Sequence, residues 1–129
     1  MLVDGYVPVA CDGKITQLDC ERKLNTPPTL ATFRPDAFGV SPTTGAFALG
    51  EAKTSSDIDT AHTRRQLIVF SSISEKNTGE VCRLYVAVPL SDAGVLDRVL
   101  GDLGLIGAPN IKSIYIPDCL LEEDARLYA

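Results

Sequence analysis

Residues 34–53 of the 129-residue chain read RPDAFGVSPTTGAFALGEAK, and the fold is predicted outward from this stretch. Two extended runs, AFGV and AFALGEAK, flank the turn-forming SPTTG at residues 41–45, which favours an antiparallel hairpin. Side chains alternate along a strand, so Glu51 and Lys53 lie on one face of the second run. Because Asp36 precedes the first strand and Glu51 ends the second, both carboxylates can meet at one edge of the predicted sheet.

Downstream of the hairpin, start and stop signals predict alternating helices and strands. These elements are a helix at 57–73 with Ser55 or Ser56 as its N-cap, a strand at 81–88, a helix that begins at Ser91 and ends at Gly104, and a strand at 111–116. A strand, a helix and a strand in this order imply a parallel crossover. We therefore predict an α/β fold with a mixed central sheet flanked by helices.

Upstream of the hairpin, residues 2–10 predict a strand or an ordered arm. Residues 15–24 predict a short helix, which the NTPP sequence at 25–28 ends. The β-prone run TLATF at 29–33 is predicted to form a three-strand meander with the hairpin. The last residues, 120–129, predict a short acidic helix or tail.

Length and composition point to a single domain over residues 1–129. No apolar run approaches the ~20 residues of a bilayer span, and the N-terminus lacks a signal-peptide pattern, so we expect a cytoplasmic protein without a membrane partner. A net charge of -5 excludes a general attraction to nucleic acid. The four cysteines are far apart and form no C-x2-C pair, which indicates reduced thiols rather than a zinc site.

The acidic pair and its lysine have the composition of a phosphodiester-cleaving site. Two carboxylates from adjacent strands, often with a backbone carbonyl, can hold Mg2+ or Mn2+ and leave positions for water and substrate. Lys53 follows Glu51 by two residues and projects from the same face of the strand. Its ammonium can therefore orient an attacking water and offset developing negative charge.

These residues resemble the PD-(D/E)XK nuclease superfamily, whose fold is called restriction-endonuclease-like. Pro35-Asp36 and Glu51-Ala52-Lys53 match the two halves of its motif. On the following predicted helix, QLIVF at residues 66–70 is similar to the Q-h-x-x-Y motif of RecB-type and Holliday-junction-resolvase-like members, with Phe70 in place of tyrosine. The resemblance covers about residues 29–116.

The resemblance implies a Mg2+- or Mn2+-dependent deoxyribonuclease that acts on DNA. Because the chain is acidic and only 129 residues long, we expect it to act as a homodimer or within a larger complex. By family analogy, the metal ligands are Asp36, Glu51, the backbone carbonyl of Ala52 and, from the first helix, Glu21, and the catalytic residues include Lys53 and Gln66. Two departures are visible. The glycine–hydrophobic–hydrophobic–aspartate motif of some RecB-type nucleases is not evident, and the cysteines do not match the iron–sulfur members, so no such cluster is expected.

Other readings of the same residues stay open. The chain could be a catalytically inactive nuclease-fold module that binds nucleic acid or protein, or an unrelated α/β protein in which the motifs occur by chance. Arg34, His62 and Arg65 are candidate nucleic-acid contacts, but His62 could equally be an exposed helix residue. The arginines at 64 and 65 could form a solvated basic face paired with Asp57 or Asp59.

Overall fold

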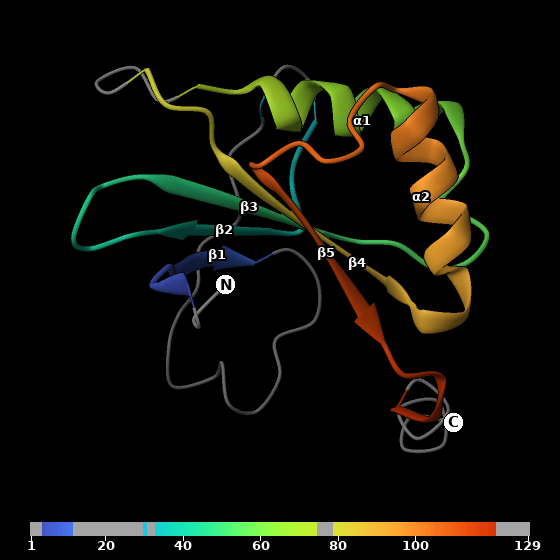
Figure 1. Ribbon diagram of the computed structural model, residues 1–129. Coiled ribbons are helices and arrows are strands. Elements are labelled where there is room, and N and C mark those ends of the chain that lie inside the picture. The colour runs from blue at the N-terminus through green and yellow to red at the C-terminus, as the bar shows by residue number, and fades with distance from the viewer. Residues whose placement is uncertain (1–3, 12–29, 31–32, 75–78, 121–129) are drawn as a thin grey trace.

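A computed structural model of the protein describes residues 4–11, 30, 33–74 and 79–120. These residues form a five-stranded sheet in which the strand order follows the chain (Figure 1). The strands are β1 (Val7–Cys11), β2 (Ala37–Val40), β3 (Phe47–Ala52), β4 (Arg83–Pro89) and β5 (Ile111–Ile116). The first three pair antiparallel, whereas β3, β4 and β5 pair parallel. The predicted α/β fold with a mixed sheet is confirmed.

The β2–β3 hairpin forms where the sequence predicts it. Ala37 pairs with Gly50 and Val40 pairs with Phe47. Hydrogen bonds from Ser41 N to Ala46 O at 2.9 Å and from Gly45 N to Ser41 O at 2.8 Å close the turn. Gly45 has a φ of 75°, which glycine adopts at no steric cost. The same register extends one residue beyond the Ala37–Gly50 pair, so Asp36 lies opposite Glu51.

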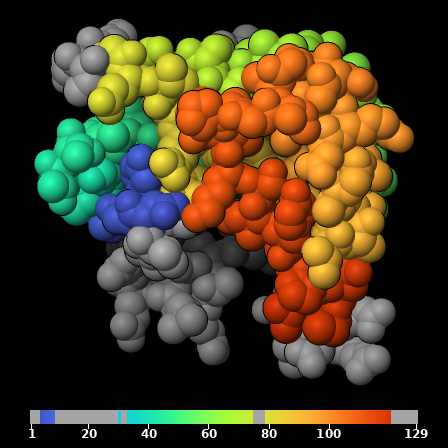
Figure 2. All heavy atoms as spheres, in the orientation of Figure 1, coloured from blue at the N-terminus to red at the C-terminus, as the bar shows by residue number. Residues whose placement is uncertain are grey.

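Two helices cover one face of the sheet (Figure 1). They are α1 (Ala61–Ser72) and α2 (Ala93–Asp102), the second of which follows the short 3-10 helix η2 (Leu90–Asp92). The core between helices and sheet consists of the fully buried side chains Leu49, Ile58, Leu67, Phe70, Leu84, Val86, Val88, Leu96 and Val99. On the side seen in the space-filling view, α2 and β5 form a continuous surface (Figure 2). Within the described part of the chain, neither helix could cross a membrane.

The predicted start of α1 was wrong by four residues. Thr60 is the N-cap, and its hydroxyl accepts a hydrogen bond from Thr63 N at 3.0 Å. Asp57 belongs to the preceding turn, where its carboxylate accepts a bond from Thr54 at 2.6 Å. Ser55, a predicted cap, instead donates to Asp92 at the end of η2. The serine hydroxyl is therefore used in a tertiary contact that helix-capping signals do not reveal.

The second helix also begins differently from the prediction. Ser91 lies inside η2 and donates to the Asp118 carboxylate at 3.1 Å rather than capping α2. The predicted end of the helix is confirmed, because α2 stops at Asp102 and Gly104 adopts a φ of 71° two residues later.

The strand that pairs with β2 comes from a different segment than predicted. In the TLATF run at 29–33, the described residues are Leu30 and Phe33, which form an isolated bridge with each other, and Phe33 N donates to Leu30 O at 2.9 Å. Val7–Cys11, predicted as a strand or an arm, takes the edge position beside β2 instead. The predicted helix at 15–24, which includes Glu21, and the tail from 121 onwards lie outside the described residues.

Candidate active site

The structure brings Asp36 and Glu51 together through two backbone hydrogen bonds. The Asp36 N–H donates to Glu51 Oε1 at 3.1 Å, and the Ala52 N–H donates to Asp36 Oδ2 at 2.8 Å. Each carboxylate is therefore held by a backbone group of the opposite strand, and the hairpin register fixes both positions.

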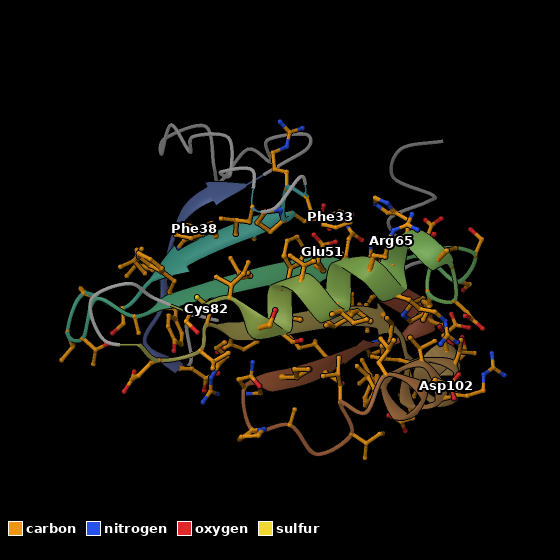
Figure 3. All side chains as sticks on the ribbon, turned by 90° about the horizontal axis from the view of Figure 1, so that it is seen from above. Phe33, Phe38, Glu51, Arg65, Cys82 and Asp102 are labelled. Carbon is orange, nitrogen blue, oxygen red and sulfur yellow. The ribbon has the colours of Figure 1, made fainter. Side chains whose placement is uncertain are left out.

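Lys53 and Gln66 extend the acidic pair into a connected polar group. Lys53 Nζ lies 3.3 Å from Glu51 Oε2 and donates to Gln66 Oε1 at 2.5 Å. Gln66 is buried on α1, which places its amide above the end of β3. Figure 3 shows Glu51 on its strand beneath this helix. We refer to Asp36, Glu51, Lys53 and Gln66 together as the acidic–lysine cluster.

Burial shifts the pKa of the Glu51 carboxyl group. Only 4% of the residue is exposed. Burial, followed by the negative charge of Asp36, raises the pKa of Glu51 to about 7, against the opposing effect of Lys53. Near neutral pH the carboxyl group is therefore divided between its protonated and ionised forms. A second positive charge beside it would keep it ionised.

The raised pKa of Glu51 predicts that this residue lowers stability as the pH rises. Between pH 4.5 and about 7 the folded state keeps a proton that the unfolded state has lost, so the unfolding free energy falls across this window. The full difference corresponds to about 3 kcal/mol. We expect Glu51→Gln to remove this dependence, so urea denaturation at pH 4.5, 6 and 8 should give wild-type and variant curves that diverge with pH. Parallel curves would show that Glu51 titrates in its ordinary range.

The donor set fits a small divalent cation. Mg2+ in proteins is usually held by one or two carboxylates and keeps several waters. The oxygens of Asp36 and Glu51 each retain lone pairs beyond those used in their present hydrogen bonds. Among the described residues no third Asp, Glu, His or Cys joins them into a larger ligand group. Asp36 and Glu51 would therefore hold the ion, while the Ala52 carbonyl and Glu21 remain predicted ligands.

Two pockets lie at the end of β3, where the side chains of Glu51 and Gln66 are buried. A pocket of about 210 Å³ is lined by Asp36, Glu51, Ala52 and Ala87 among others. It adjoins a second pocket of about 370 Å³ that includes Lys53, and the two share Ala52 and Ala87.

The candidate nucleic-acid contacts lie on the surface near the cluster. Arg34, His62 and Arg65 are exposed. The rings of His62 and Phe33 form an edge-type contact at a centroid distance of 5.3 Å. Phe33 was not among the residues predicted to lie near the site, although it directly precedes the Arg34-Pro35-Asp36 stretch in the sequence.

Arg64 has a structural role. It forms ion pairs with Asp59 at 2.9 Å and with Asp102 at 3.0 Å, and these bonds raise the pKa of its guanidinium. Asp59 also pairs with Arg98 at 3.0 Å. The predicted alternative, a basic residue of α1 paired with Asp59, is confirmed for Arg64. Arg64 therefore links the start of α1 to α2.

No family model matches the chain, and neither a curated protein nor a solved structure is detectably similar to it.

Proposed function

We propose that this chain is a cytoplasmic, metal-dependent deoxyribonuclease with a restriction-endonuclease-like core, acting as a homodimer or within a larger complex. The observation that carries the proposal is the continuous contact from Asp36 through Glu51 and Lys53 to Gln66. This is a pair of carboxylates with an ammonium group fixed beside them. Such an arrangement can hold a divalent cation and stabilise the charge that develops during phosphodiester hydrolysis.

A bound Mg2+ or Mn2+ would neutralise the scissile phosphate and lower the pKa of a water molecule. Asp36 and Glu51 supply the negative charge that attracts the cation. Their backbone hydrogen bonds hold them in place before substrate arrives. This pre-organisation reduces the cost of assembling the site during the reaction.

Lys53 performs the second task, which is to orient the attacking water and to offset the charge that develops on the phosphate. Its long side chain would otherwise sample many rotamers. The carbonyl oxygen of Gln66 accepts one of its protons, and Glu51 attracts the ammonium charge from the other side. Gln66 therefore acts as a positioning residue that directs Lys53 toward the carboxylates.

The proposal is tested by incubating purified protein with single-stranded and duplex DNA in Mg2+ or Mn2+. We expect cleavage by the wild type and a loss of about 100-fold or more in Asp36→Asn, because one of two charged ligands is removed. Asp97→Asn removes the same charge from the exposed surface of α2 and should cleave like the wild type.

Titration calorimetry with Mn2+ separates the two nuclease-fold readings. Metal binding that Asp36→Asn abolishes, without cleavage of any DNA substrate, would favour the inactive module. Undiminished cleavage by Asp36→Asn would refute the assignment of the site.

A further inference from the structure

Three aromatic rings connect the core to the surface beside the acidic–lysine cluster. Phe70 on α1 is fully buried and meets Phe33 edge to face, at a centroid distance of 6.2 Å and an angle of 81°. Phe33 in turn meets His62 at 5.3 Å and 65°. The backbone bridge between Phe33 and Leu30 holds the middle ring. The exposed ring of His62 therefore rests against Phe33, which in turn packs on the core.

The supported ring lies next to the proposed site of hydrolysis. His62 precedes Gln66 by four residues on α1, so the two side chains are neighbours on one side of the helix. Phe33 precedes Asp36 by three residues. A nucleotide chain reaching the acidic–lysine cluster would pass this ring.

Charge attraction alone would give this surface little binding free energy for DNA, so another interaction must contribute. The chain carries a net charge of -5. On α1, Arg64 is committed to Asp59 and Asp102, which leaves Arg65 as the exposed arginine of this helix. Affinity for DNA normally depends on several cations that neutralise phosphates. Stacking of bases on aromatic rings can replace part of that energy, at about 1–3 kcal/mol per base in general.

We propose that His62, presented on Phe33, is a stacking platform for an unpaired nucleobase, so that the substrate is single-stranded DNA. Arg65, three residues further along the same helix, contacts an adjacent phosphate. Duplex DNA fits less well because its base faces are already covered by neighbouring base pairs. This inference rests on the proposed function, since it places the substrate strand at the same cluster.

The test measures binding separately from cleavage. A fluorescein-labelled 15-nucleotide oligodeoxythymidylate is titrated with Lys53→Met protein in Mg2+, and anisotropy gives Kd. Adding His62→Ala should weaken binding about tenfold, whereas adding His62→Phe, which keeps an aromatic face, should stay within about twofold. Because stacking involves no counterion release, the dependence of Kd on salt should not change in His62→Ala. A 15-base-pair duplex should bind more weakly and respond little to either substitution.

Three results would overturn the platform: unchanged binding by His62→Ala, a loss in His62→Phe as large as that in His62→Ala, or duplex binding as tight as single-strand binding. Thermal unfolding of each variant, with Arg98→Ala on α2 as a surface control, verifies that the exposed substitutions leave the fold intact. Binding that depends on His62 without wild-type cleavage would remove only the hydrolytic proposal. Cleavage by the wild type, together with a Kd that does not change in His62→Ala, would refute only the stacking proposal.

Discussion

Lys53→Met is expected to lower the rate of DNA cleavage by about 1,000-fold without unfolding the protein. Methionine keeps most of the aliphatic length but removes the ammonium group that lies 3.3 Å from Glu51 and donates to Gln66. The water would lose its orienting group, and the phosphate would lose a fixed positive charge. Glu51 would also lose the attraction that opposes its raised pKa, so a larger share of it would be protonated at neutral pH. Single-turnover cleavage in saturating Mn2+ measures the effect.

Lys112→Met is the matched control for Lys53→Met. Lys112 lies on β5, where its ammonium pairs with Asp4 at 3.3 Å, outside the acidic–lysine cluster. The same chemical change at this position should leave the cleavage rate within about twofold, since an exposed ion pair contributes little. If Lys53→Met retains more than a tenth of the wild-type rate, Lys53 has no essential role in the reaction.

Phe70→Ala is expected to lower the free energy of unfolding by about 3–5 kcal/mol. The ring is fully buried on the face of α1 that packs against the sheet, and its removal leaves a cavity beneath Phe33. Domains of this size have a total stability of about 5–15 kcal/mol, so the loss is a large part of the whole. Urea denaturation followed by circular dichroism gives the difference from the wild type.

Ile68→Ala, two residues earlier on the same helix, provides the comparison. Ile68 is 49% exposed, so its truncation should cost no more than about 0.5 kcal/mol. The contrast depends on α1 being placed as the structure shows it, with Phe70 inward and Ile68 outward. Equal losses in the two variants would mean that the helix is rotated from this position.

The hairpin and the acidic pair were predictable because they depend on short-range rules. A turn-forming run with Gly45 joins two β-prone segments, and the alternation of side chains places Glu51 and Lys53 on one face. Antiparallel pairing across a short turn leaves few registers in which both strands are satisfied. The observed register therefore followed from residues within a 20-residue stretch.

The helix starts were less predictable because polar side chains have several competing partners. Ser55 and Ser91 both look like N-caps in sequence, yet they bond to Asp92 and Asp118 respectively. Thr60, which does cap α1, carries no stronger local signal. Ile68 is an apolar residue of the helix, but the packing of α1 leaves it exposed. Such choices depend on which partners the folded chain brings within reach.

The amino-acid sequence alone determined which residues of the hairpin share a face and that Asp36 and Glu51 meet at its end. Only the tertiary structure decided that Gln66 would reach Lys53, that Phe33 would support His62, and that Glu51 would be covered. The physical reason is that a strand's alternation is a property of its own backbone. The position of a helix over that strand, and with it the loss of solvent that raises the pKa of Glu51, arises only when distant segments pack together.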